Sequence, residues 1–269
     1  MDTFSYTLNV GGRLINLAEP QVMGILNLTP DSFYAPSRKE SEDAVRQRAR
    51  QIVEEGGSII DVGACSTRPG SVPCTEEEEM ERLHRGLQAV RAEVPDALLS
   101  VDTFRSNVAR MCVEEFGAAI INDVTGGDGD ERMFQTVAEL GVPYVLTCNK
   151  AENVLQFFAE RINTLRSLGQ KDILLDPGFG FGKDLNDNYR LLAQLESLKM
   201  LELPLLIGVS RKSMIQRVLN VDADHALNGT TVLHTLCLAK GCAQILRAHD
   251  VREAVEAVKI TQYIKDCKD

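Results

Sequence analysis

The chain has 269 residues, of which 44% are hydrophobic and 25% charged, and its formal net charge at pH 7 is −10. This length and composition suit a globular protein with a large buried core. The negative charge disfavours nucleic acid as a partner, because nucleic acids bind basic surfaces, but it leaves room for a small anionic substrate held by a local basic cluster. Every apolar run is interrupted by Asp, Gly or Pro before it is long enough to span a bilayer.

The first segment, residues 4–17, alternates polar and apolar residues around Gly11 and Gly12, which predicts a β-hairpin. We expect this hairpin to close the N-terminal end of the fold that follows. The first residues lack the basic start and apolar stretch of a secretory signal, and the seven cysteines are scattered without a CxxC motif. We therefore expect a cytoplasmic protein with reduced thiols, and neither disulfides nor a zinc site.

From residue 22 onward, short apolar runs alternate with amphipathic helical patterns. Each run is rich in Leu or β-branched residues and apolar on both faces, as is typical of parallel strands buried on both sides. The eight predicted strands span residues 22–26, 58–63, 97–102, 118–123, 143–147, 172–176, 204–210 and 243–247. The clearest predicted helices span residues 40–56, 76–93, 105–117, 186–198 and 225–241.

Eight strand–helix units predict a (β/α)8 TIM barrel over about residues 22–264, within a single domain of residues 1–269. A doubly wound open sheet is the alternative, although the even spacing of the units favours closure. Glycines at the predicted helix ends, such as Gly117 and Gly141, are typical of helix C-caps. Four glutamates, residues 76–79, begin one helix, and we expect them to form a solvated first turn.

In a barrel of this kind, the residues that follow the strands share one face, where active sites are built. The predicted strand ends present Asn27, Asp61, Ser66, Thr67, Arg68, Asp102, Asn122, Asp123, Asp176, Arg211, Lys212, Arg247 and His249. An aspartate at such a position is often a helix N-cap, and both Asp102 and Asp123 are open to that interpretation. So many polar residues at the same end of the strands predict a binding site.

One set of these residues suits a heterocycle. Asp102, Asn122 and Asp176 offer oxygens that accept from N–H donors, such as those at the edge of a 2-amino-pyrimidinone. Lys212 can donate to a carbonyl oxygen or ring nitrogen of the same ring. In an alternative chemistry, Lys212 forms a Schiff base, with its neighbour Arg211 lowering its pKa.

A second set is cationic and comprises Arg68, Arg247 and His249, with Asn27 nearby. Arginine binds phosphate oxygens through two parallel hydrogen bonds. Asn27 can supply an oxygen ligand to Mg²⁺, which prefers a few protein ligands together with phosphate oxygens. A molecule with an amino-heterocycle at one end and a diphosphate at the other suits both sets, and the arginines would stabilise departing negative charge.

Seven motifs make the chain resemble the dihydropteroate synthases. They are GILNLTPDSF (24–33), IIDVGACSTRPG (59–70), SVDTF (100–104), INDVTGG (121–127), LLDPGFGFGK (174–183), LIGVSRKS (206–213) and LRAHDV (246–251). They occur in the order of the family and cover the chain from about residue 22 to residue 260. The resemblance implies a (β/α)8 barrel, usually a homodimer, that uses Mg²⁺ in folate biosynthesis. Such enzymes condense 6-hydroxymethyl-7,8-dihydropterin diphosphate with 4-aminobenzoate, giving 7,8-dihydropteroate and pyrophosphate.

The resemblance also implies residue roles. The pterin would be held by Asp102, Asn122, Asp176 and Lys212. The diphosphate would be contacted by Arg68, Arg247, His249 and Asn27, of which Asn27 would also bind the metal. The aminobenzoate site, where sulfonamides compete, would be shaped by Phe33, Thr67, Pro69, Phe181, Lys212 and Ser213. The implied mechanism is SN1-like: diphosphate leaves first, and the aniline nitrogen then attacks a stabilised pterin cation. Two loops, residues 29–37 and 66–69, would close on the substrates.

The chain departs from the family pattern at three places. Ala64-Cys65 stand where Gly-Glu is common, residues 34–36 replace a Ser-Asp-Gly continuation, and Thr147-Cys148 replace Met-His. Because none of these changes removes a residue to which the resemblance assigns a ligand-binding role, we expect an active enzyme. Two rivals are a methyltransferase domain that binds methyltetrahydrofolate, which needs no diphosphate site, and an inactive pterin-binding paralogue.

Overall fold

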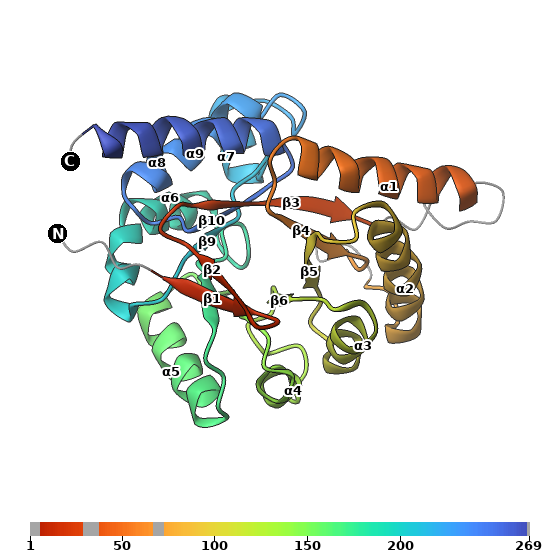
Figure 1. The fold of residues 1–269 in the computed structure, drawn as a ribbon. Helices are drawn as coiled ribbons and strands as arrows, with labels where there is room; N and C mark the ends of the chain where they lie inside the picture. The colour runs from red at the N-terminus through yellow and green to blue at the C-terminus, as the bar shows by residue number, and fades with distance from the viewer. Residues whose placement is uncertain (1–5, 29–37, 67–72, 268–269) are drawn as a thin grey trace.

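The computed structural model describes residues 6–28, 38–66 and 73–267. Its main sheet is parallel, with the strand order β8-β7-β6-β5-β4-β3-β10-β9, and helices surround it (Figure 1). A parallel bridge between Leu175 and Leu205 joins the two edges of this sheet, which closes it into the predicted (β/α)8 barrel. The strands are β3 (Gln21–Asn27), β4 (Ile59–Gly63), β5 (Leu98–Asp102), β6 (Ile120–Asp123), β7 (Tyr144–Thr147), β8 (Ile173–Asp176), β9 (Leu206–Ile207) and β10 (Ile245–Ala248).

At least one helix follows each of these strands along the chain. The helices are α1 (Arg38–Glu54), α2 (Glu76–Glu93), α3 (Ser106–Phe116), α4 (Met133–Leu140), α5 (Val154–Ser167), α6 (Leu185–Ala193), the 3₁₀ helix η2 (Leu195–Leu201), α7 (Ser213–Leu219), α8 (Leu227–Ala239) and α9 (Val251–Asp266). The predicted helix 186–198 divides into α6 and η2, and the predicted strand 204–210 is shortened to the two residues of β9. Gly117 and Gly141 are left-handed C-caps, as predicted.

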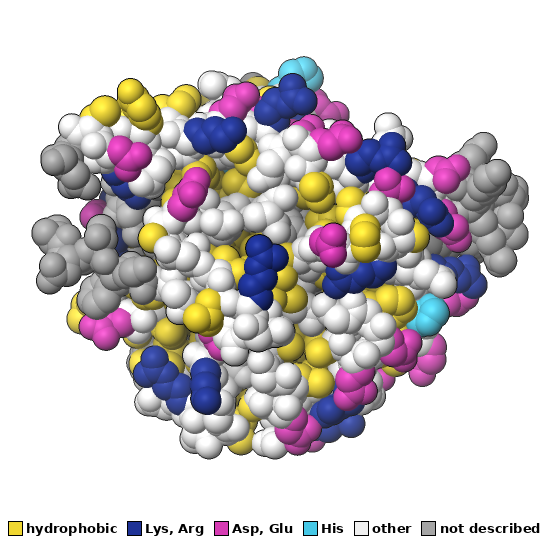
Figure 2. Space-filling view, in the orientation of Figure 1, with side chains coloured by type: hydrophobic (Ala, Val, Ile, Leu, Met, Phe, Trp, Pro, Cys, Tyr) yellow, Lys and Arg dark blue, Asp and Glu magenta, His cyan; other side chains and the backbone are white. Residues whose placement is uncertain are grey.

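The predicted hairpin is present as β1 (Thr7–Val10) and β2 (Arg13–Asn16), and it lies across the ring of strands in Figure 1. Its buried side chains, Leu8 and Val10, belong to one apolar cluster with the first inward residues of the barrel strands, such as Met23 and Ile59. The hairpin therefore closes the N-terminal end of the barrel with apolar contacts. On the outer surface of this end, acidic and basic side chains are scattered over many elements (Figure 2).

Two expectations about polar residues need comment. All seven cysteines are free, as expected. The solvated first turn predicted for residues 76–79 is wrong at Glu79, whose residue exposure is 0%. The helix α2 does begin with a capping box between Thr75 and Glu78, but its fourth residue faces inward. Among the described helices, none combines the length and the apolar character needed to cross a membrane.

Candidate active site

Strand periodicity places the polar groups of the site inside the barrel. Successive side chains of a strand point to opposite faces, so a residue two positions after an inward apolar residue also points inward. Ile59, Ile120, Leu174 and Ile245 all belong to the inner apolar cluster near the hairpin. Two positions later, on the same side of their strands, stand Asp61, Asn122, Asp176 and Arg247. The barrel interior thus changes from apolar to polar along the direction of the strands.

The centre of this polar layer is a network around Asp61. Its carboxylate accepts hydrogen bonds from Ser100 Oγ at 2.6 Å, from Asn122 Nδ2 at 3.1 Å and from Arg247 Nε at 2.6 Å. The Asp61 side chain is completely buried, so these donors replace the water that a charged carboxylate requires. Asp61 therefore holds both Asn122 and Arg247 in fixed orientations.

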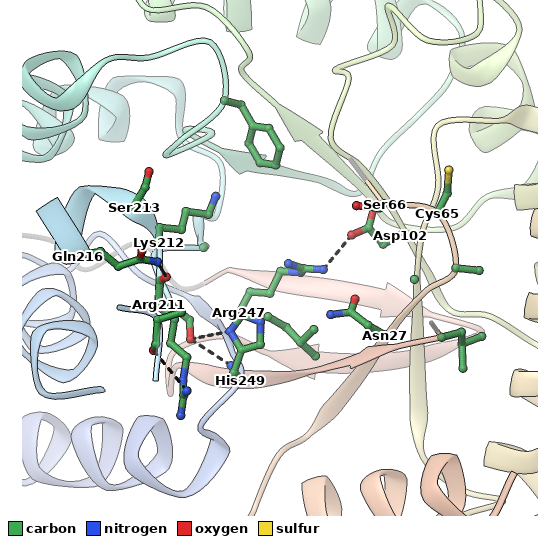
Figure 3. A pocket seen from close by; sticks show the side chains of 18 of the residues that line it. Asn27, Cys65, Ser66, Asp102, Arg211, Lys212, Ser213, Gln216, Arg247 and His249 are labelled. Atoms are coloured by element: carbon green, nitrogen blue, oxygen red, sulfur yellow. Dashed lines mark hydrogen bonds and ion pairs between the residues drawn. The ribbon is translucent and has the colours of Figure 1, made fainter. Parts of the chain in front are cut away.

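Arg247 also reaches Asp102, donating from Nη2 to Oδ2 at 2.8 Å (Figure 3). Burial raises the pKa of Asp102 to about 7, although the guanidinium of Arg247 opposes the rise. Neither Asp102 nor Asp123 is a helix N-cap, because the N-cap residues of α3 and α4 are Arg105 and Arg132. Asp123 accepts hydrogen bonds from Thr125, Gly127 and the Tyr144 hydroxyl, which stabilise the loop after β6.

Two groups of the predicted heterocycle set retain acceptor capacity. Asn122 donates to Asp61, but its Oδ1 is buried without a hydrogen-bond partner. Asp176 accepts from the Gly178 backbone at 2.7 Å through Oδ1, and burial raises its pKa. A Cβ on Gly208, which lines the cavity described below, would lie 3.6 Å from Oδ2 of Asp176. The lack of a side chain at Gly208 therefore leaves this carboxylate oxygen uncovered on the cavity side.

Lys212 lies between Asp176 and an aromatic ring. Its Nζ donates to the Phe179 carbonyl and lies 4.4 Å from the centre of the Phe181 ring. Burial lowers its pKa to about 8; Asp176 opposes this shift, and Arg247 adds to it. The prediction that Arg211 lowers this pKa is wrong, because the guanidinium of Arg211 is turned to the carboxylate of Asp250, with N–O distances of 2.7 and 2.8 Å.

The predicted cationic set is only partly cationic. His249 lies 3.0 Å from Ser210 Oγ through Nδ1, and burial lowers its pKa to about 4, so the ring is neutral at pH 7. Arg247 keeps its charge, but it pairs with Asp102 of the heterocycle set and, through Asp61, is linked to Asn122 of the same set. The two sets therefore form one continuous network, which corrects their predicted separation.

These groups surround a cavity of about 910 Å³ at the C-terminal ends of the strands. Figure 3 shows Arg247, Asp102 and Asn27, from three strands, and Lys212, from the N-cap of α7, directed toward one space. The predicted residues that line it are Asn27, Asp102, Phe181, Lys212, Ser213, Arg247 and His249, while Asn122 and Asp176 are buried beside them. Four predicted residues, Phe33, Thr67, Arg68 and Pro69, lie outside the described residues.

The structure adds residues to which the sequence pattern assigned no role. The sequence listed Asp61 among the strand-end residues, although it lies in the middle of β4. Its role in the network is evident only from its hydrogen-bond partners in the structure. Ser100 orients Asp61, and Ser210 orients His249. A period-two count from the apolar residue at the start of each strand would have identified Asp61 and Ser100 as inward residues.

Comparisons with known proteins agree with this geometry. Residues 23–249, more than half of the chain, match the family model described as "Pterin binding enzyme". The chain is 36% identical to the dihydropteroate synthase of Clostridium beijerinckii over 96% of its own length and 99% of that protein.

Solved structures agree as well. The fold matches a Xanthomonas albilineans dihydropteroate synthase with 4-aminobenzoic acid at a TM-score of 0.89 and 36% identity, covering 97% of this chain and 98% of that one. It matches a Yersinia pestis dihydropteroate synthase in a sulfonamide complex at a TM-score of 0.88 and 36% identity, covering 97% and 100%.

Proposed function

This chain belongs to the dihydropteroate synthase family, and we propose that its barrel mouth joins 6-hydroxymethyl-7,8-dihydropterin diphosphate to 4-aminobenzoate. The observation that carries the proposal is the convergence of Asp102, Asn122, Asp176 and Lys212 around one interior space. These residues come from four different strand ends, and together they offer acceptors and a donor on opposite sides of a ring. Pyrophosphate is the second product.

The pterin end occupies the deepest part of the cavity. The unpaired Oδ1 of Asn122 and the Oδ2 of Asp176 accept from the N–H groups of the heterocycle, which removes the cost of leaving a buried amide oxygen unsatisfied. Lys212 donates to a ring oxygen or nitrogen, for which it exchanges its bond to the Phe179 carbonyl. A site built this way discriminates strongly against rings that lack those hydrogen-bonding groups.

Charge in the cavity suits an SN1-like reaction. The bond between the pterin methylene carbon and the diphosphate oxygen breaks, and its electron pair leaves with the diphosphate. In their ionised form, Asp102 and Asp176, which lie in or beside the cavity, stabilise the remaining delocalised cation electrostatically. The aniline nitrogen then forms the new C–N bond and releases its proton to water, so no strong general base is required. Phe181 and Ser213 line the route of the aminobenzoate.

The diphosphate lies toward Asn27, Arg247 and His249, all of which line the cavity. Asn27 is exposed at the end of β3 and offers a single amide oxygen, which suits Mg²⁺ because this ion takes most of its ligands from water and phosphate. Bound Mg²⁺ supplies charge neutralisation for the departing diphosphate. Neutral His249 contributes a ring N–H or an acceptor nitrogen, and no net charge.

The decisive experiment measures pyrophosphate and dihydropteroate after both substrates are mixed with the enzyme and Mg²⁺. A family enzyme with an intact site forms the two products in equal amounts. Pterin binding without pyrophosphate release would indicate an inactive paralogue, and methyl transfer from methyltetrahydrofolate would indicate the rival barrel. Either result would overturn the proposal.

Binding tests the assigned role of Asp176. The substitution Asp176→Asn keeps the size of the side chain and removes its charge, and we expect the dissociation constant for the pterin to rise about 10- to 100-fold, the value of a hydrogen bond to a charged group. Calorimetry with a non-reactive pterin measures this change. Asp172→Asn, at the opposite end of the same segment, is the matched control. An unchanged dissociation constant in Asp176→Asn would contradict the role of acceptor.

We also propose that two chains associate through α7, α8 and α9. Large apolar side chains are exposed on all three helices, and Figure 2 shows hydrophobic groups over the C-terminal part of α9. They are Val218, Leu219, Val232, Leu236, Ile260, Tyr263 and Ile264. Exposed apolar groups in such numbers favour a protein partner, and analytical ultracentrifugation of the wild type and of Leu236→Glu tests whether that partner is a second copy.

The cytoplasmic location expected from cysteine usage remains a prediction.

A further inference from the structure

A cluster of potential metal ligands lies in the wall of the substrate cavity. One sulfur each from Cys65 and Cys74 and a carboxylate oxygen of Glu79 all lie within 4.8 Å of one another. Both cysteines line the cavity, and Figure 3 shows Cys65 on the side of the cavity away from Lys212. No motif in the sequence indicates this cluster, because the three ligands come from different places: the segment after β4, the residue before the N-cap of α2, and the first turn of α2.

Glu79 provides the second observation. Its residue exposure is 0%, and Oε1 is buried without a hydrogen-bond partner. Its other oxygen, Oε2, forms an ion pair with Arg105. A buried carboxylate oxygen without a donor is costly, and its occurrence calls for a ligand or a structural explanation. Thr103 and Arg105 both interact with this carboxylate and oppose the rise in the pKa of Glu79 that burial causes, and one of its oxygens lies within 4.8 Å of both sulfurs.

Arg105 holds the cluster in place. Besides its ion pair with Glu79, it donates to the backbone carbonyl of Cys74 at 2.6 Å and lies over the ring of Phe104. Groups of this kind, which do not touch a metal but orient its ligands, are typical of metal sites. Burial raises the pKa of the Cys74 thiol to about 11, so a metal ion has to displace its proton on binding. In the metal-bound form the charges balance, since two thiolates and a carboxylate carry three negative charges and Arg105 with a divalent ion carries three positive charges.

Distances agree with a thiophilic ion. Two sulfurs bound tetrahedrally to one Zn²⁺ lie about 3.8 Å apart, given Zn–S bonds of about 2.3 Å. Ligand atoms already within 4.8 Å of one another need to move by no more than about an ångström to reach that spacing. Thiolates select soft or borderline ions such as Zn²⁺ over Mg²⁺, so this cluster differs in chemistry from the oxygen ligand Asn27.

We propose that Cys65, Cys74 and Glu79 bind a thiophilic divalent metal ion of the Zn²⁺ class in the wall of the substrate cavity. Three protein ligands leave one coordination position for water or another small ligand, as in open zinc sites. Its ligands are distinct from the residues assigned to the pterin and the diphosphate, although Cys65 and Cys74 line the same cavity.

Cadmium tests the proposal, because its thiolate complexes absorb in the ultraviolet. Titration of the reduced full-length protein with Cd²⁺ should give a charge-transfer band that saturates at one ion per chain. Cys65→Ser and Cys74→Ser should each weaken Cd²⁺ binding by at least about 10- to 100-fold. Loss of a group that merely orients a metal ligand already lowers metal affinity by roughly that factor. Cys267→Ser, which changes an exposed cysteine outside the cluster, is the matched control and should titrate like the wild type.

Glu79→Gln tests the carboxylate ligand. This variant should retain the band and bind Cd²⁺ more weakly. If it unfolds because Arg105 loses its ion pair, the cysteine variants still decide the matter.

Alkylation provides a second measurement. Zn²⁺ should slow the modification of Cys65 and Cys74, mapped by mass spectrometry, and leave the rate at Cys267 unchanged. The proposal would be overturned if Cys65→Ser and Cys74→Ser both bound Cd²⁺ like the wild type, or if only Cys267→Ser lost the band. Alkylation rates of Cys65 and Cys74 that Zn²⁺ leaves unchanged would overturn it too. A disulfide between Cys65 and Cys74 in the untreated protein would also overturn it, because it removes both sulfur ligands.

Discussion

The two ends of the barrel interior are built from the same strands and have opposite chemistry. At the N-terminal end, the first inward residues of the strands pack against Leu8, Val10 and Leu17 and form a dry apolar cluster. At the C-terminal end, the inward positions two residues further along carry the network of Asp61, Ser100, Asn122 and Arg247. One end is closed by the hairpin, and the other opens into a cavity of about 910 Å³.

In these strands, the residue that stabilises the barrel and the residue that belongs to the site are therefore only two positions apart. Apolar groups at the closed end stabilise the barrel through burial and packing and touch no substrate. The buried charged groups at the open end have lost their hydration, and their ion pairs with one another compensate for that loss. They contribute to function only when a substrate is bound. Substitutions at the two ends should therefore have different kinetic signatures.

The largest effect is expected for Arg247→Ala at the open end. The substitution leaves the buried carboxylates of Asp61 and Asp102 without their cation, and breaking a buried pair costs about 3–5 kcal/mol. Both thermal stability and turnover should fall, as measured by calorimetry and pyrophosphate release. Arg50→Ala removes an ion pair whose arginine is 56% exposed, and it should change stability by less than about 1 kcal/mol. A wild-type melting temperature in Arg247→Ala would contradict the network.

At the closed end, Leu8→Ala should lower stability by about 2–5 kcal/mol and leave kcat/KM unchanged. The cavity forms in the apolar cluster, on the side of the barrel away from the substrates. Leu14→Ala is the control in the same hairpin, since Leu14 is 70% exposed, and it should change stability by no more than about 0.5 kcal/mol. A reduced kcat in Leu8→Ala with full folding would show that the two ends are coupled.

A smaller effect is expected from pH. The pKa of Lys212 is lowered to about 8, so the side chain is charged below that pH and becomes neutral as the pH rises through it. Pterin binding, which uses the charged donor, should weaken on the alkaline side of pH 8. Lys212→Met should bind the pterin about 10- to 100-fold more weakly below pH 8 and should lack this alkaline step. An alkaline step of the same size in Lys212→Met would assign the titration to another group.

Stability gives the opposite sign for the same residue. The lowered pKa means that the unfolded chain holds this proton more tightly than the folded chain, so charged Lys212 destabilises the fold below pH 8, and this penalty fades as the pH rises above 8. Lys212→Met should therefore melt at an equal or higher temperature than the wild type at pH 7, while its pterin affinity falls. Such a trade between stability and activity is typical of active-site groups.

Much of the fold and part of the site followed from local patterns. Apolar runs ending in polar residues indicated both the strands and the end of the barrel that carries the site, because parallel strands bury both faces and share one C-terminal edge. Asp102, Asp176, Lys212 and Arg247 were identified in this way. Boundaries were less accurate where turns intervene, as in the division of residues 186–198 into α6 and η2.

Partners and protonation were settled by tertiary structure. Arg247 is 145 residues from Asp102 and 186 from Asp61 along the chain, and no local pattern shows that it neutralises both. The neutral state of His249 and the lowered pKa of Lys212 come from burial, which depends on everything packed around them. The same is true of Glu79, whose run of four glutamates suggested solvent exposure.

The sequence alone thus determined eight parallel strands with polar groups gathered at one of their ends, and favoured their closure into a barrel, since periodicity and strand polarity are local properties of the chain. Only the tertiary structure decided which of those groups pair, which stay charged, and that Cys65, Cys74 and Glu79 lie together. The reason is physical: electrostatic energies depend on separation and burial in three dimensions, and neither quantity is encoded in the spacing of residues along the chain.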